Sequence, residues 1–221
     1  MELRPEALAP PRRLLSLDLL AVLRGTMIRN TLKCNLPSIS ANVIVPESPQ
    51  KFSETITAER PFAKVLRLLD TDGNGSLSAD EKQRARIVLY GHSWGAAETL
   101  VFARELDGKG IPVLLTIQVD SVAKPGRDDS TVPPNVAQAI NLYQSRGPIH
   151  GRAQILAADP GRTTIIGNFH LTYQDASINC DNYPWYARTF NRPHHEIEND
   201  PRVWNLAASL IQSEFTGTGP T

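Results

Sequence analysis

The sequence has little cysteine and no excess charge of either sign. Its 221 residues include two cysteines, Cys34 and Cys180, so a framework of several disulfides is excluded. Two buried or free thiols are expected, and one disulfide between them is the alternative. The 23 Lys and Arg residues balance the 23 Asp and Glu residues, which gives a formal net charge of zero. Nucleic acid is therefore not expected as the main partner, because neutralising phosphates requires a basic surface.

The sequence also lacks a long hydrophobic run. The most apolar early stretch, residues 14–23, is too short to cross a bilayer and contains Asp18. Arg24 follows it, where a secretory signal peptide would have small residues. We therefore expect an amphipathic or buried helix over residues 14–23 and no transmembrane segment. Localisation stays open, with the cytoplasm as the default, and the oligomeric state is unknown.

The spacing of apolar residues along the sequence becomes regular near residue 61. Residues 1–60 form a poorly defined N-terminal segment in which residues 42–45 are a candidate strand, whereas residues 61–216 alternate between helical and strand-like stretches. The expected helices are 62–69, 79–85, 94–106 and 201–215, and the expected strands are 87–90, 111–119, 139–143 and 163–169. This order predicts the α/β class, with a mostly parallel sheet flanked by helices.

Residues 87–100, IVLYGHSWGAAETL, join an apolar strand to a helix through a Gly-x-Ser-x-Gly turn. In this setting the pattern indicates a nucleophile elbow, in which a strained turn lifts the Ser93 hydroxyl above the edge of the sheet. Gly91 and Gly95 would allow close backbone approach, and the amide of Trp94 would face a developing oxyanion. A structural serine in an ordinary strand-to-helix turn is the alternative.

This stretch resembles the α/β-hydrolase fold, specifically its lipase, esterase and thioesterase branches, in which Gly-His-Ser-x-Gly recurs. The resemblance extends from the loop at residues 70–81 to the last helix and implies a triad in the chain order Ser, Asp or Glu, His. It places the base in a loop shortly before Asp200-Pro201, where His194 is preferred and His195 is the alternative. His92 is expected to pack rather than to act as the base.

The candidate acid is Asp120, at the end of the strand that follows the nucleophile helix. A carboxylate there could orient the imidazole and stabilise its cation. Asp128 and Asp129 are alternatives, and a purely loop-anchoring role for Asp120 stays open. Most members of the resembling fold carry the acid one strand later, where this chain has Gln144 and no carboxylate.

Residues 70–81, DTDGNGSLSADE, match the EF-hand calcium loop at every informative position. A solvated loop that binds nothing is the alternative. No second loop is present to pair with this one, so we expect a structural Ca²⁺ site, away from the chemistry, that holds the preceding helix and steadies the elbow. The expected ligands are Asp70, Asp72, Asn74, Ser76 and Glu81.

The chain before Ser93 lacks the glycine-rich turn that supplies the second oxyanion donor in the resembling fold. Before Gly73 the sole glycine is Gly25. Either an unusual loop supplies the donor, or the N-terminal strands are lacking or altered, which the change in pattern near Pro61 favours.

The sequence therefore predicts a serine hydrolase of carboxylic esters or thioesters with a structural Ca²⁺ ion. The alternative is a calcium-dependent binding or scaffold protein on a non-catalytic hydrolase-like fold. Aromatic residues gather just before the expected base, at 183–186 and Phe190. They could form one wall of an acyl pocket, or anchor a loop on the core.

Overall fold

The chain is built around one parallel sheet. The computed structural model describes residues 19–24, 41–44, 61–123, 125–174, 178–181 and 183–216. In these residues a six-stranded sheet has the order β2-β1-β3-β4-β6-β8, and each neighbouring pair is parallel. The strands are β1 (Leu19–Arg24), β2 (Ala41–Ile44), β3 (Ile87–His92), β4 (Val113–Val119), β6 (Val136–Tyr143) and β8 (Thr164–His170). A short parallel pair is formed by β5 (Thr131–Val132) and β7 (Leu156–Ala157).

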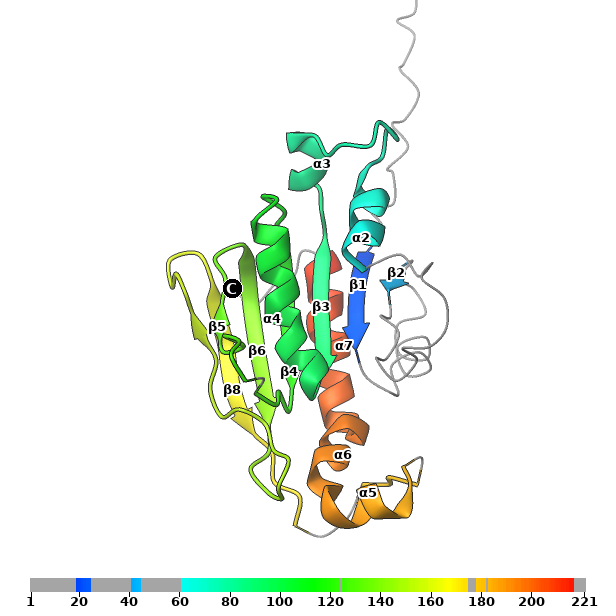
Figure 1. The fold of residues 1–221 in the computed structure, drawn as a ribbon, viewed down its shortest axis with the longest axis vertical. Coiled ribbons are helices and arrows are strands. Elements are labelled where there is room, and N and C mark those ends of the chain that lie inside the picture. Colours follow the sequence, from blue (N-terminus) through cyan, green and yellow to red (C-terminus); the bar gives the residue numbers. More distant parts are fainter. Residues whose placement is uncertain are drawn as a thin grey trace, which may run out of the picture.

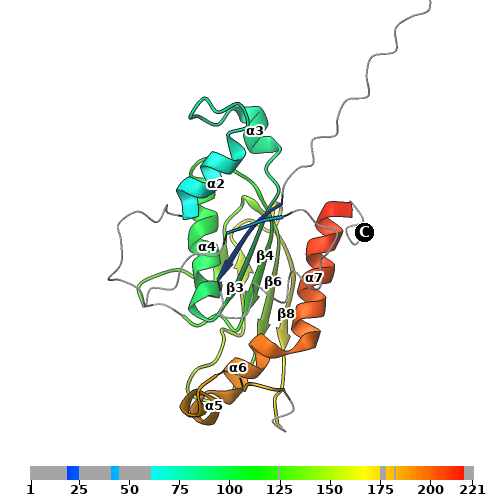
Figure 2. The same cartoon turned by 90° about the vertical axis from the view of Figure 1, so that its right-hand side faces the viewer.

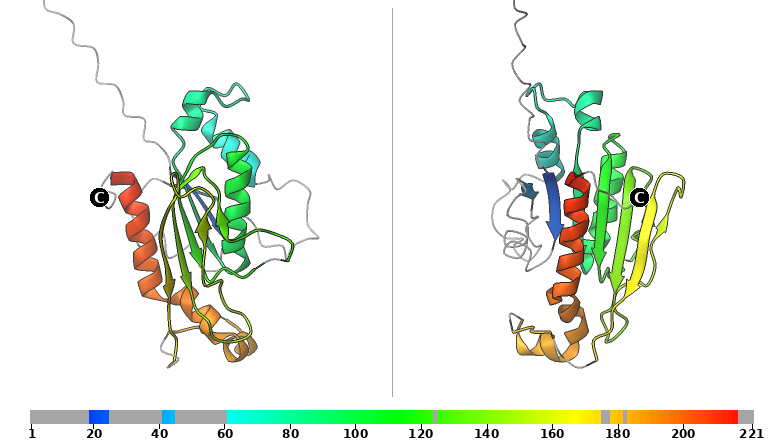
Figure 3. Two further views of the ribbon diagram at one scale, coloured as in Figure 1. Left: turned by 90° about the vertical axis from the view of Figure 1, so that its left-hand side faces the viewer. Right: turned by 180° about the vertical axis from the view of Figure 1, so that it is seen from behind.

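Helices cover both faces of this sheet, which confirms the predicted α/β class (Figure 2). Helices α2 (Pro61–Leu69) and α4 (Trp94–Asp107) lie on one face, and α7 (Pro201–Thr216) crosses the other, as the rear view in Figure 3 shows. Helices α5 (Trp185–Phe190) and α6 (Arg192–Asn199) lie beyond the carboxyl ends of the strands, and α3 (Ala79–Gln83) lies at the opposite end (Figure 1). None of the helices in the described ranges has the length and apolarity needed to cross a membrane.

Strand β3 is buried along its whole length because helices pack on both of its faces. Ile87 and Leu89 belong to the hydrophobic cluster under α4, whereas Val88 and Tyr90 belong to the cluster under α7. The ring of Tyr90 stacks on that of Trp204 in α7 with centroids 5.2 Å apart. The sheet thus fixes the position of the turn that follows β3.

The N-terminal segment differs from the expectation. The predicted helix over residues 14–23 is wrong for residues 19–23, which belong to β1, while residues 14–18 lie outside the described part. An uninterrupted apolar run suits an inner strand of a parallel sheet as well as a buried helix, and periodicity alone does not separate the two. Residues 42–44 of the candidate strand lie in β2, which begins at Ala41, and residue 45 lies outside the described part. The sheet therefore includes two strands from residues 1–60, the segment in which strands were expected to be missing or altered.

The packing of β3 against α4 leads to a prediction about Gly91. A Cβ atom at Gly91 would clash with the backbone of Gly95 and Ala96. We expect Gly91→Ala to lower the free energy of unfolding by about 1–3 kcal/mol, because the strand and helix must move apart. Gly108→Ala is the matched control, since a Cβ there makes only ordinary contacts and the residue already has helical dihedral angles. Urea unfolding would measure both, and equal stability of the two variants would contradict the prediction.

Candidate active site

Ser93 occupies a strained turn between β3 and α4. Its backbone has φ 59° and ψ −129°, a combination that residues with a side chain rarely adopt. Hydrogen bonds hold this turn: the Ser93 amide donates to the carbonyl of Val119 (3.0 Å), and the Ser93 carbonyl accepts from the amide of Ala96 (3.1 Å). The turn places Ser93 at the carboxyl edge of the sheet, directly before the N-terminus of α4.

Asp120 lies at the same edge, one residue beyond β4, which pairs with β3. It is fully buried and also has a positive φ, 46°. Gln144, at the end of β6, donates to both carboxylate oxygens, from its backbone amide (3.0 Å) and from Nε2 (2.8 Å). In the fold that the sequence resembles, the acid follows this strand. Here Gln144 follows it and holds the carboxylate of Asp120 instead. Gly151 makes room for it, because a Cβ there would clash with Asp120.

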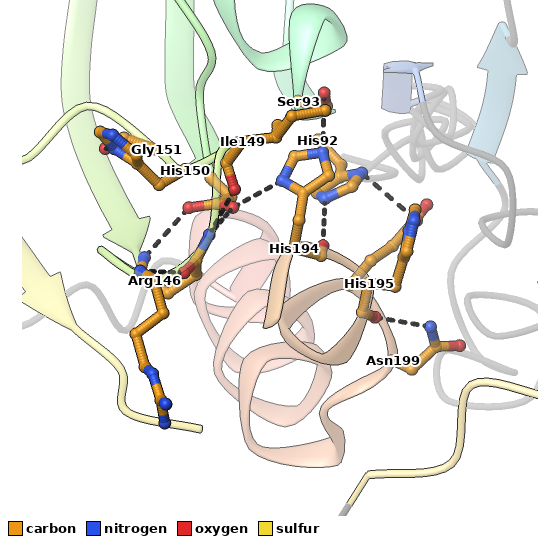
Figure 4. A network of polar contacts seen from close by, with 12 residues as sticks. His92, Ser93, Arg146, Ile149, His150, Gly151, His194, His195 and Asn199 are labelled. Carbon is orange, nitrogen blue, oxygen red and sulfur yellow. Dashed lines mark hydrogen bonds and ion pairs between the residues drawn. The ribbon is translucent and has the colours of Figure 1, made fainter. Parts of the chain in front are cut away.

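His194 contacts both residues, and Figure 4 shows the dashed line between its ring and Ser93. Its Nδ1 lies 2.6 Å from Oδ2 of Asp120, and its Nε2 lies 2.9 Å from Oγ of Ser93. Since an ionised carboxylate only accepts hydrogen bonds, Nδ1 carries the proton and Nε2 presents a lone pair to the serine hydroxyl. The structure thus brings Ser93, His194 and Asp120 into one hydrogen-bonded chain.

His194 lies on helix α6, so the loop predicted around it is wrong. Pro193 stands at the start of α6, where proline suits a helix, and Arg192 pairs with Glu196 one turn later (3.1 Å). The buried residues His194, Ile197 and Glu198 recur at helical spacing. The spacing of these residues in the sequence could therefore have predicted a helix at this position.

The alternative base, His195, points elsewhere. Its ring stacks on Tyr183 with centroids 3.9 Å apart. Burial, with smaller contributions from the charges of His194 and His92, lowers the pKa of His195 to about 4. The structure does not bring His195 into the chain of Ser93 and Asp120.

The alternative acids also have other partners. Asp129 is fully buried and forms an ion pair with Arg152. Oδ1 of Asp128 accepts hydrogen bonds from the amides of Ser130 (3.1 Å) and Thr131 (3.0 Å). Both carboxylates hold the loop between β4 and β5 rather than the candidate base.

Two residues at this site were not predicted to take part in it. His92, expected to be a packing residue, places Nε2 3.0 Å from the carbonyl oxygen of His194 and Nδ1 3.3 Å from Oε2 of Glu198. Burial lowers the pKa of His92. Glu198 is itself buried and also bonds the hydroxyl of Tyr183. No short motif marks this pair, because its members lie 106 positions apart and meet only in the folded chain.

The aromatic cluster near the base divides into two parts. Tyr183 is anchored by the stack on His195 and the bond to Glu198. Trp185 and Phe190, on α5, are 69% and 66% exposed, so they do not anchor the segment in the core. Trp94, next to Ser93, is 60% exposed as well. Large apolar side chains are therefore accessible at the carboxyl edge of the sheet.

The loop at residues 70–81 brings three of its expected ligands together. Carboxylate oxygens of Asp70, Asp72 and Glu81 lie within 4.8 Å of one another. Asn74 borders this cluster through a hydrogen bond from Nδ2 to Asp72 (2.8 Å), while its Oδ1 accepts from the amide of Ser76 (2.8 Å). The structure thus gathers three carboxylates and places the side-chain oxygen of Asn74 on Ser76.

Glu81 joins the two ends of this loop. Its Oε1 accepts from the amide of Thr71 (2.7 Å), and its Oε2 accepts from the amide of Ser78 (2.9 Å). These hydrogen bonds, with the backbone bond from Ser78 the largest, lower the pKa of Glu81 to about 2. Glu81 is therefore ionised over the physiological range, as a carboxylate that binds a cation must be.

No family model matched this chain in comparisons with known proteins, and no curated protein matched it. The function of the site must therefore be inferred from its own side chains.

The lowered pKa of His195 leads to a prediction about stability. Its folded pKa of about 4 lies below the usual value of 6.5, so between these values the unfolded chain binds a proton that the folded chain does not. The free energy of unfolding should therefore fall as the pH drops from 6.5 towards 4. Above pH 6.5, His195 should not make this free energy depend on pH. In His195→Phe, which keeps a ring on Tyr183, urea midpoints should fall less over the same window. Parallel curves for the two proteins would contradict the prediction.

Proposed function

We propose that this protein is a serine hydrolase of carboxylic esters or thioesters, with Ser93 as nucleophile, His194 as base and Asp120 as acid. The observation that carries this proposal is the imidazole of His194, which bridges Ser93 Oγ (2.9 Å) and Asp120 Oδ2 (2.6 Å). The chain order Ser, Asp, His and the strand–turn–helix around Ser93 support an α/β-hydrolase-like fold.

Acylation would begin at the hydroxyl of Ser93. As Oγ attacks the acyl carbon, its proton passes to Nε2 of His194, and the carbonyl electrons move onto oxygen. The tetrahedral intermediate then collapses, the bond to the alcohol or thiol breaks, and the leaving group takes the proton from Nε2. Deacylation repeats the sequence with water as nucleophile and returns the proton to Ser93.

Asp120 would stabilise the imidazolium that forms in both steps. Its carboxylate is buried, so its attraction for a positive charge at 2.6 Å is weakly screened. The two donors from Gln144 keep it aimed at Nδ1 and compensate for the water that burial removes. The hydrogen bond to Asp120 also fixes the tautomer in which Nε2 accepts the serine proton.

The oxyanion would be stabilised at the N-terminus of α4. This helix begins at Trp94, directly after Ser93, and the partial positive charge of a helix N-terminus favours an anion there. Strand β1 runs beside β3 with Arg24 opposite Gly91, so β1 also ends at this edge. A second donor from the chain after β1 would lie outside the described residues.

The accessible apolar side chains support an acyl substrate. Trp94 follows the nucleophile, and α5, which carries Trp185 and Phe190, lies at the same end of the sheet (Figure 1). Exposed aromatic surface beside a reactive hydroxyl suits a substrate with an apolar part.

We also propose that the loop at residues 70–81 binds Ca²⁺ as a structural ion. Its supporting observations are the three gathered carboxylates and the positive φ of Gly73 (70°) and Gly75 (80°), which the tight turn needs. Leu77 packs against the hydrophobic cluster shared by β3 and α4. An ion there would tie α2 and α3 together at the amino end of β3.

The triad leads to a labelling prediction. A fluorophosphonate should add one phosphonyl group to the native protein, detected as a single mass increase, and none to Ser93→Ala. Asp120→Asn should slow the labelling by about 10⁴-fold, because the imidazole then loses the partner that fixes its tautomer. Asp128→Asn is the matched control, since the Asp128 carboxylate bonds its own loop and Arg104 of α4 but not His194, and it should label at the native rate.

Absence of labelling in a folded sample would overturn the hydrolase proposal. The calcium-dependent binding or scaffold protein would then be the better account. Equal slowing in Asp120→Asn and Asp128→Asn would overturn the assignment of the acid while leaving the nucleophile in place.

The calcium proposal predicts a rise in thermal stability. At a Ca²⁺ concentration 100-fold above the dissociation constant, binding to the folded state alone should add about 2.7 kcal/mol. Glu81→Gln should abolish this gain, because it removes the bidentate carboxylate that closes the loop. Glu105→Gln, an exposed substitution on α4, should retain it. Calorimetric titration without heat, together with an unchanged melting temperature, would contradict the proposal.

A further inference from the structure

Behind the candidate base lies a second histidine–carboxylate pair. Both members are buried: the side chain of His92 is 7% exposed and that of Glu198 is 2% exposed. Nδ1 of His92 lies 3.3 Å from Oε2 of Glu198, and Nε2 lies 3.0 Å from the carbonyl oxygen of His194. The same Oε2 is bonded by the hydroxyl of Tyr183. Figure 4 shows the ring of His92 beside that of His194, whose centroid is 4.5 Å away.

The hydrogen bonds of this pair require one shared proton. A carbonyl oxygen only accepts, so Nε2 of His92 carries a hydrogen. In a neutral ring Nδ1 then carries no hydrogen, and its lone pair faces an oxygen of Glu198. A stable contact therefore needs one proton between Nδ1 and Oε2, held either by the imidazole or by the carboxyl group.

We propose that His92 and Glu198 form a positioning pair, which holds the backbone of His194 and so keeps its ring between Ser93 and Asp120. This rests on the proposed function in so far as His194 is the base. His92 is the last residue of β3 and the immediate neighbour of Ser93, whereas His194 lies in the first turn of α6. The bond from His92 thus ties the helix of the base to the strand of the nucleophile.

The pair works in one protonation state. Losing the shared proton places the lone pair of Nδ1 against the carboxylate, and the ring relieves this by moving its remaining proton from Nε2 to Nδ1, which ends donation to His194. Gaining a second proton creates a cation beside the imidazolium that catalysis forms. The other titratable groups around the pair, from every element that faces it, are Tyr90, Asp120, Tyr183, His194 and His195.

Three variants separate positioning from mere packing. His92→Leu removes the donor to His194. His92→Gln restores it, because the amide nitrogen of Gln can occupy the place of Nε2. Glu198→Gln supplies an amide N–H to Nδ1 and so fixes the donating tautomer without a shared proton. All three would be compared with the native protein, after urea unfolding has shown that each is folded.

The experiment has two readouts. The first is the second-order rate constant for fluorophosphonate labelling as a function of pH. His92→Leu should lose about 10²-fold, as expected for a misplaced base, and His92→Gln should recover most of this loss. The native rate should decline in alkali, where the pair loses its shared proton. Glu198→Gln should keep most of the native rate near neutral pH and should not show this decline. Native rates in His92→Leu, no recovery in His92→Gln, or an unchanged pH profile in Glu198→Gln would each overturn the proposal.

The second readout does not depend on catalysis. The proton on Nδ1 of His194, in its 2.6 Å bond to Asp120, should give a low-field resonance in the proton NMR spectrum. This resonance should persist in His92→Gln and disappear in His92→Leu. If it persists in both, the positioning role is wrong even where labelling succeeds. If the native protein does not label and the resonance still depends on His92, the hydrolase function fails while the positioning pair stands.

Discussion

The hydrogen bonds of one imidazole ring join the parts of the chain that make up the site. His194 lies 101 residues from Ser93 and 74 residues from Asp120, and its two ring nitrogens bond both. A planar ring places these nitrogens at fixed directions, so all three residues must be held separately with little error. The backbone of β4 holds Ser93, Gln144 holds Asp120, and His92 contacts the carbonyl of His194.

The local conformation at the site conflicts with ordinary backbone preferences. Ser93 and Asp120 are the two non-glycine residues with positive φ in the described part of the chain. Each is placed where a neighbouring glycine, Gly91 or Gly151, has no room for a Cβ. A positive φ costs free energy in a residue with a side chain, so it persists only where the surrounding structure imposes it. Here a parallel sheet buried on both faces does so.

Sequence patterns that lie within one segment were predictive. The turn at Ser93, the strand before it and the helix after it form one continuous pattern, and the end of an apolar strand marked Asp120. Predictions failed where a pattern suits two structures or where partners are distant. The apolar run at residues 19–23 suits strand and helix alike, and its place beside β3 is a tertiary outcome. The contact between His92 and Glu198 carries no local signal, because β3 and α6 meet only after folding.

The two proposed sites lie at opposite ends of β3, and this separation limits how one could influence the other. Six residues of strand span about 20 Å, and residues 71–76 and 78–80 of the loop are exposed to solvent, which screens a charge there. An ion at Asp70 and Glu81 would therefore have little electrostatic effect on the imidazole of His194. The physical link is the strand itself, since α3 leads directly into β3 and Leu77 packs on the cluster beneath α4. Any effect of the ion on Ser93 must consequently be mechanical, through the order of β3 and α4, and would accompany a change in stability.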